Sequence, residues 1–180
     1  MIEYLIGAGT IGAAALVSKL LQLEQTQPTL EIHHRPFPLE WREILETKWP
    51  IYCRLPENLR DQLEQLTLVF LERIEIRGID GLEITDEIRV LTASQACLLL
   101  VNQNTFFPAK LKSVVMRPSA YTATQYDSVG GVQSEREIHV LGQSWESGLV
   151  VLSWDNTRTG ATNAKDGRNL ALHEFAHQLD

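Results

Sequence analysis

Two histidines and one glutamate near the end of the sequence have a spacing that supports metal chemistry. His173, Glu174 and His177 form the pattern His-Glu-x-x-His within the stretch LALHEFAHQLD, residues 170–180. On an α-helix, residues four positions apart lie about 40° apart around the axis and about 6 Å apart along it. The imidazoles of His173 and His177 can therefore bind one zinc ion, Zn²⁺, at Zn–N distances of about 2.0–2.1 Å.

Glu174 follows the first histidine directly, so its carboxylate is displaced from the two imidazoles. Zinc lowers the pKa of a bound water towards about 7. Glu174 is then placed to accept a proton from that water and to pass it to the leaving amine of a cleaved peptide. The alternative is a pair of hydrogen-bonded core histidines. The flanking residues favour the metal site, because buried histidines and carboxylates are costly unless paired or metal-bound. These uncharged flanks are Leu170, Ala171, Leu172, Phe175, Ala176, Gln178 and Leu179.

The pattern supplies two ligands, and the sequence offers no third with a convincing position. Asp180 lies nearly on the helix face of His173, but about 7.5 Å along the axis beyond the midpoint of the two histidines. A short carboxylate cannot span that distance, so a supporting role is expected for Asp180. The other histidines, and the carboxylates nearby in sequence, have no spacing that favours them: His33, His34, His139, Glu135, Glu137, Asp155 and Asp166.

The first part of the domain shows helical periodicity. Residues 39–49 and 56–74 repeat apolar residues every three to four positions, and residues 78–81 interrupt the pattern. A further helix is expected after Thr85, an N-cap residue followed by two acidic residues, and it extends to Leu99.

Short, β-branched segments follow these helices. Residues 113–116, 136–142 and 148–154 are bounded by Pro, Gly or Ser and are predicted to be strands, with a loop at 130–131. Helices, a small sheet and a final histidine-bearing helix predict an α+β domain.

The N-terminal segment, residues 1–34, differs from the domain predicted for residues 35–180. Gly7, Gly9 and Gly12 match the dinucleotide pattern G-x-G-x-x-G. The following segment lacks the acidic residue that would bind a ribose, and no further βαβ unit follows. This motif is therefore not taken as a cofactor site.

Residues 4–23 are largely apolar, with Lys19 near their end. Their length approaches the ~20 residues that a membrane span requires. A membrane anchor and a helix docked on the domain both remain open.

Charge and cysteine content exclude some partners. The 180 residues contain 16 Lys+Arg and 23 Asp+Glu, which gives a net charge of −7. Nucleic acid is excluded as a main partner because it requires a basic face. Cys53 and Cys97 have no metal-ligand spacing and indicate a reducing compartment, so a cytoplasmic location is expected.

Three segments together resemble the Mlc titration factor A family of zinc-dependent peptidases. They are GLEITDEIRVLTASQACLLLVN, VVLSW and DGRNLALHEFAHQLD. The similarity runs from about Arg35 to Asp180, and RPFPLEWREIL resembles members with a hydrophobic N-terminal segment. The resemblance implies a zincin-like fold, zinc held by His173 and His177, and Glu174 as the general base.

The resemblance also implies a function and a longer protein. It implies hydrolysis of small peptides with aminopeptidase-like character. The alternative is a non-catalytic binding module that sequesters a transcriptional repressor of sugar-uptake genes. The third ligand of the family is a glutamate on a later helix, so a ligand beyond residue 180 is expected and the sequence is expected to be a fragment. By analogy, residues 148–154 are expected to be the edge strand that pairs with an extended substrate.

Overall fold

The computed structural model describes residues 35–103, 105–129, 132–140, 142–145, 148–163, 167 and 169–179. For the described residues between 121 and 145, it describes the backbone but not the side chains. The predicted N-terminal segment, its glycine motif and the span at residues 4–23 lie outside these residues. Within the described ranges, every helix is too short or too polar to cross a bilayer.

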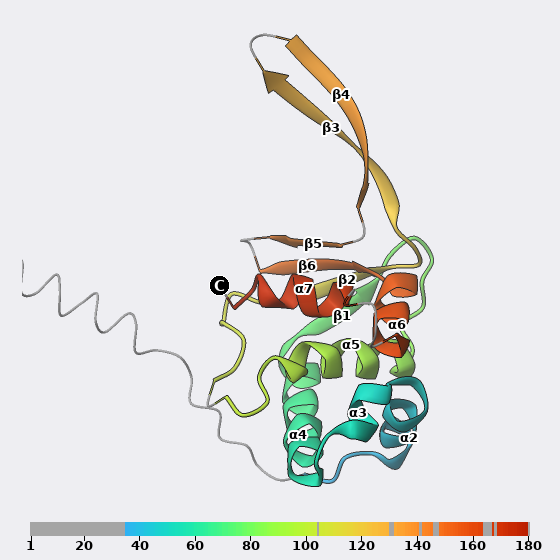
Figure 1. Cartoon of the computed structure of the whole chain (residues 1–180), viewed down its shortest axis with the longest axis vertical. Coiled ribbons are helices and arrows are strands. Elements are labelled where there is room, and N and C mark those ends of the chain that lie inside the picture. Colours follow the sequence, from blue (N-terminus) through green and yellow to red (C-terminus); the bar gives the residue numbers. More distant parts are fainter. Residues whose placement is uncertain are drawn as a thin grey trace, which may run out of the picture.

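Helices form the base of the domain in Figure 1 and the sheet lies above them. The predicted helices at 39–49, at 56–74 and after Thr85 are confirmed. The N-cap at Thr85 is also confirmed, because its Oγ1 accepts a hydrogen bond of 3.3 Å from the Ile88 N–H. The helices of this part are α2 (Leu39–Lys48), α3 (Pro50–Arg54), α4 (Glu57–Arg73) and α5 (Asp86–Leu98).

The sheet is small and mixed, and its strand order is β1-β2-β6-β5. The first three strands run parallel, and β5 pairs antiparallel with β6 at the edge. These strands are β1 (Glu75–Gly78), β2 (Ser113–Arg117), β5 (Gly142–Trp145) and β6 (Leu149–Ser153). With the helices on one side of it, the sheet gives an α+β domain, as predicted.

A separate two-stranded hairpin connects β2 to β5. It consists of β3 (Tyr121–Val129) and β4 (Val132–Val140), which pair from Tyr121↔Val140 to Val129↔Val132. In Figure 1 the hairpin extends away from the four-stranded sheet.

Two strand predictions are corrected. The strand predicted at 136–142 is divided, because β4 pairs within the hairpin and Gly142 begins β5. The segment 148–154 is not an edge strand, because β6 pairs with β2 on one side and β5 on the other. Trp154 belongs to α6 (Trp154–Thr162) instead. The edge role predicted for 148–154 was therefore wrong, and β5 occupies that position.

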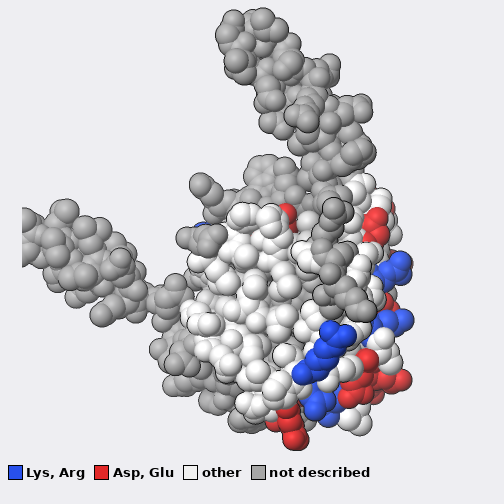
Figure 2. All heavy atoms as spheres, in the orientation of Figure 1, with Lys and Arg blue, Asp and Glu red and all other residues white. Residues whose placement is uncertain are grey.

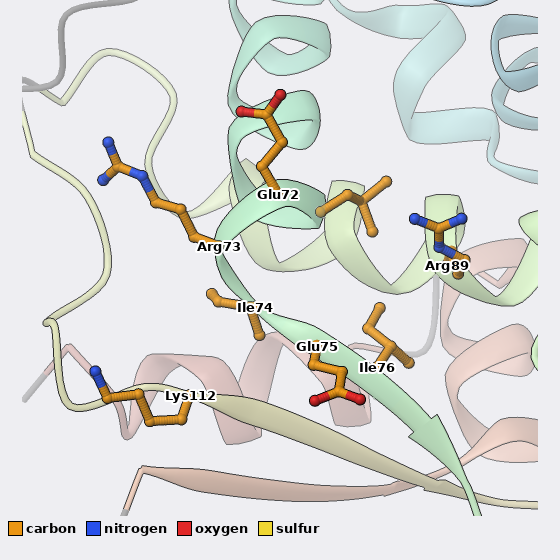
Figure 3. Close-up of a pocket in the computed structure, with 8 residues that line it drawn as sticks. Glu72, Arg73, Ile74, Glu75, Ile76, Arg89 and Lys112 are labelled. Carbon is orange, nitrogen blue, oxygen red and sulfur yellow. The ribbon is translucent and has the colours of Figure 1, made fainter.

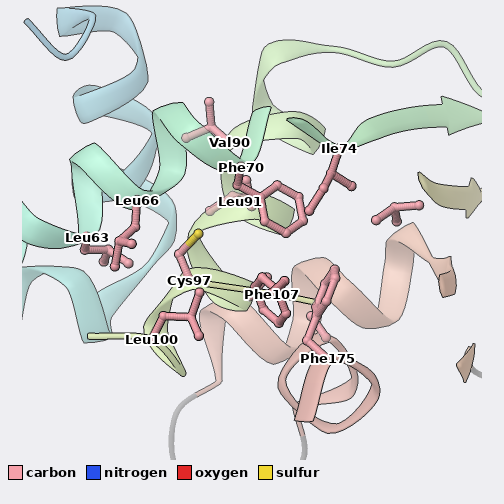
Figure 4. Packing of buried hydrophobic residues seen from close by; sticks show 14 of the residues in the cluster. Leu63, Leu66, Phe70, Ile74, Val90, Leu91, Cys97, Leu100, Phe107 and Phe175 are labelled. Carbon is pink, nitrogen blue, oxygen red and sulfur yellow. The ribbon is translucent and has the colours of Figure 1, made fainter. Parts of the chain in front are cut away.

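A cluster of aromatic rings holds the last described helix, α7 (Leu170–Ala176), on the core. The Phe175 side chain is fully buried, with ring centroids 5.6 Å from Phe70 and 5.5 Å from Phe107. Figure 4 shows these three rings in contact beneath the end of α4. The helix also packs against β5 and β6, so the sheet covers the histidine-bearing segment.

Gly148 sets the position of β6 relative to β2. Its φ of +81° favours glycine, and a Cβ at this residue would lie 1.6 Å from the Lys110 carbonyl oxygen. The Gly148 carbonyl accepts a hydrogen bond of 2.9 Å from the Lys112 N–H. The segments around Lys110 and Gly148 can approach this closely only because residue 148 has no side chain. The first residue pair of β2 and β6, Ser113↔Leu149, comes immediately after this contact.

Gly148→Ala should therefore destabilise the protein more than Gly81→Ala. Gly81 has a similar φ of +80° but open space around its Cβ position. Alanine at Gly81 should lower the free energy of unfolding by about 1–2 kcal/mol through backbone strain. Alanine at Gly148 should add a further loss of about 1–3 kcal/mol from the clash with Lys110. Urea unfolding of both variants measures the difference, and equal losses would contradict the packing role.

Candidate metal centre

The helix α7 begins at a side-chain cap. Asn169 is its N-cap residue, and the Asn169 Oδ1 accepts a hydrogen bond of 2.9 Å from the Leu172 N–H. The Asn169 carbonyl accepts from the His173 N–H at 3.1 Å, and the His173 carbonyl accepts from the His177 N–H at 3.4 Å. The backbone therefore links the cap to both candidate ligands.

The helix has one buried face and one exposed face. Ala171 and Phe175 are fully buried, whereas His173 and His177 are exposed. The Nε2 atoms of the two histidines lie 3.3 Å apart, and their rings are 4.7 Å apart at an angle of 85°. The motif spacing thus brings the two imidazoles together on the open side of α7.

This separation fits a metal ion. Two Zn–N bonds of about 2.0–2.1 Å at a tetrahedral angle place the nitrogens about 3.3–3.4 Å apart. The observed 3.3 Å between the Nε2 atoms of His173 and His177 matches that value. The donor set also suits zinc, which binds neutral imidazole.

Glu174 lies on the side of α7 that faces the protein. Its side chain is only 7% exposed. Burial raises the pKa of the Glu174 carboxyl, and the charges of His173 and His177 oppose that rise. A raised pKa brings a carboxylate closer to the range in which a general base works near neutral pH.

The third ligand is not found in the part of the chain that the structure describes. Within these residues, no three His, Cys, Asp or Glu side chains are close enough to hold a metal ion. The Asp155 Oδ1 accepts a hydrogen bond of 2.7 Å from the Asn156 N–H, a local role at the start of α6. The strand β4, in the projecting hairpin, contains His139, Glu135 and Glu137. Outside the described residues are His33, His34, Asp166 and Asp180.

Two residues that support α7 were missed from the sequence. Asn169 directly precedes the apolar run of the helix, which is a usual position for a cap, so its type and place could have indicated this role. Gln95 is fully buried in α5 and accepts a hydrogen bond from the Asn169 side chain. No local pattern marks Gln95, because its partner is distant in sequence.

Figure 2 shows how charged side chains are distributed over one face of the described residues. In Figure 2, positive and negative side chains are interleaved over α2, α3 and α6, and the surface over α5 and α7 is largely uncharged.

A pocket of about 480 Å³ lies elsewhere, between the end of α4, β1 and α5. Figure 3 shows its charged lining, in which Glu72 and Glu75 come from α4 and β1. Arg35 binds Glu72 and Arg77 binds Glu75. The residues that line this pocket include none from α7, so it is separate from the histidine pair.

Comparisons with known proteins identify the family of this chain. The sequence profile of the family described as glucose-regulated metallo-peptidase M90 matches residues 22–180. The chain belongs to this family. It is therefore a metallopeptidase-type domain, and the family name implies a metal ion.

Curated relatives confirm the resemblance. Mlc titration factor A of Klebsiella pneumoniae is 27% identical over 144 residues, which cover 79% of this chain and 52% of that protein. The Escherichia coli protein of the same name is also 27% identical over 144 residues, with the same coverage. The uncharacterized protein slr2042 of Synechocystis is 33% identical over 152 residues, covering 83% of this chain and 55% of its own length. The chain thus spans about half the length of the curated relatives it matches.

Zinc should stabilise the folded protein through the histidine pair. An ion that binds only the folded state at 100 times its Kd adds about 2.7 kcal/mol to the free energy of unfolding, so Tm should rise. His177→Ala removes one Nε2 donor and should abolish most of that rise. His139→Ala, in the β4 hairpin, should keep it. Calorimetry with and without Zn²⁺ measures the shifts, and equal shifts in the two variants would contradict the site.

Proposed function

We propose that the chain carries the metal-binding and proton-transferring part of a zinc-dependent peptidase with a zincin-like arrangement. Its substrates are small peptides, and its activity is aminopeptidase-like. The observation that carries this proposal is the separation of 3.3 Å between the Nε2 atoms of His173 and His177, beside the buried Glu174. Membership of a metallo-peptidase family supports it.

His173 and His177 are the proposed zinc ligands, and the third is a glutamate beyond residue 180. The fit of the two imidazoles to tetrahedral zinc supports the first two. Catalytic zinc sites hold three protein ligands and keep a position open. The matched region covers only 55% and 52% of two curated relatives. A protein of their length would contain further residues that could supply this ligand.

Glu174 is the proposed general base. When bound, the metal polarises the peptide carbonyl and makes a water more acidic. Glu174 accepts the proton of the attacking water and delivers it to the leaving amine. Its burial beside the histidines limits access of bulk water to the carboxylate.

The free edge of β5 (Gly142–Trp145) is the proposed binding edge for an extended peptide. Within the described residues β5 pairs on one side only, with β6, and it contacts α7. A peptide that adds to this edge forms backbone hydrogen bonds, which position it without requiring a particular sequence. This assignment replaces residues 148–154, whose strand is paired on both sides.

Glu174→Gln should separate metal binding from catalysis. Glutamine has nearly the same size and cannot accept the proton, so zinc should remain bound and peptide hydrolysis should fall by at least about 10²-fold. Zinc content by atomic absorption and turnover of a small aminoacyl substrate by the complete protein measure both effects. Turnover at the wild-type rate would exclude Glu174 as the base.

A second candidate function is the sequestration of a transcriptional repressor. Several relatives are named Mlc titration factor A, and this name supports repressor sequestration as an alternative function for the present chain. The largely uncharged surface over α5 and α7 suits a protein partner. In this case the Glu174→Gln variant and the zinc-free protein would bind the repressor as tightly as the wild type, and calorimetric titration with purified Mlc distinguishes the two functions.

A further inference from the structure

A buried amide connects α5 to the start of the histidine-bearing helix. Gln95 is fully buried, and its Nε2 donates to the carbonyl oxygens of Leu91 at 3.0 Å and Thr157 at 3.3 Å. Because both partners are acceptors, the amide has one orientation, and its Oε1 faces Asn169. The Asn169 Nδ2 donates to that oxygen at 2.7 Å.

Asn169 uses every polar atom of its side chain. Its Oδ1 caps α7 by accepting from Leu172, so its Nδ2 must be the donor on the other side. The Nδ2 donates to Gln95 and also to the Gly160 carbonyl at 3.1 Å. The three helices α5, α6 and α7 therefore meet at one side chain, and each of them packs against the other two.

Gly160, which has no side chain, allows Asn169 to approach the backbone of α6 closely. A Cβ on Gly160 would lie 3.2 Å from the Asn169 Cα and Cγ atoms, closer than ordinary van der Waals contact. The close approach holds Asn169 against α6, while Gln95 holds it from α5. This contact is independent of the hydrogen bonds and restricts the same residue.

We propose that Gln95, through Asn169, is a positioning residue that determines where α7 presents His173 and His177. A seven-residue helix has little stability of its own, so its place depends on such contacts. The path is short: Gln95 binds the Asn169 side chain, and the Asn169 carbonyl accepts from the His173 N–H. This inference rests on the proposed zinc-binding function of the two histidines.

Asn169→Asp isolates this connection from helix capping. Aspartate keeps an oxygen that accepts from Leu172 and favours a helix N-terminus. Its second oxygen replaces the Nδ2 donor and faces two acceptors, the Gln95 Oε1 and the Gly160 carbonyl. Gln95 cannot relieve this by rotating its amide, because its Oε1 would then face the Leu91 and Thr157 carbonyls. Gln95→Met removes the same connection from the other side.

The complete protein carrying each variant is tested by zinc affinity and by amide exchange. Competition with a chromophoric chelator should show zinc affinity about 10–100-fold weaker than wild type for both Asn169→Asp and Gln95→Met. In the metal-free protein, amide hydrogens of residues 170–177 should exchange faster in both variants, while those of α4 keep their protection.

Two controls remove the trivial explanations. Asn102→Asp makes the same charge change at an exposed turn and should leave zinc affinity unchanged. Leu63→Ala creates a cavity at a fully buried residue of α4 and should lower Tm without weakening zinc binding. A loss of affinity in Leu63→Ala that matches the loss in Asn169→Asp would show that general stability explains the effect, and it would overturn the proposal.

Two further results of the zinc-binding measurement would decide between the positioning role and the metal site itself. Asn169→Asp with wild-type zinc affinity would mean that capping alone matters, and the proposal would fall whether or not α7 exchanges faster. A wild-type protein that binds no zinc would defeat the proposed function itself. Failure of the positioning role is thus distinguished from failure of the metal site.

Discussion

A helix of two turns is too short to persist in water, so the placement of α7 by its neighbours is the constraint on which the candidate site depends. Burial of a phenylalanine side chain contributes about 1.5–3 kcal/mol, and Phe175 provides this anchor within the aromatic cluster. Asn169 supplies the second anchor at the N-terminus of the helix. One anchor fixes the buried face and the other fixes the start, so the exposed face that carries His173 and His177 is determined.

The candidate site contains a buried carboxyl group, that of Glu174, whose burial lowers the stability of the fold. Glu174 is buried on the face of α7 that also carries Ala171 and Phe175, and burial raises the pKa of its carboxyl. A carboxylate in such a place lowers stability unless it is paired, which is typical of groups kept for function rather than folding. The contrast with Glu64 supports this interpretation. Glu64 is also buried, but it accepts hydrogen bonds from Arg42 and Tyr52 and joins α2, α3 and α4.

The order of the described strands explains how α7 comes to lie beside the edge strand β5. Parallel strands require long connections, and β1, β2 and β6 are joined through α5 and the hairpin segment. The chain leaves the hairpin to form β5, turns at Gly148 and enters β6 in the opposite direction. The edge position therefore falls to β5, which contacts α7, and the longer strand β6 lies inside the sheet.

The sequence by itself determined the helices, the cap at Thr85, the α+β class and the histidine pair. Each of these depends on residues a few positions apart, and a helix brings such residues together by its own geometry. Only the tertiary structure decided that β5 is the edge, that Asn169 binds Gln95 and that Phe175 closes the aromatic cluster. Those contacts join segments far apart in the chain, so no local pattern specifies them. The histidine pair is thus set by local spacing, whereas the contacts of Asn169 with Gln95 and of Phe175 with Phe70 that position it are nonlocal.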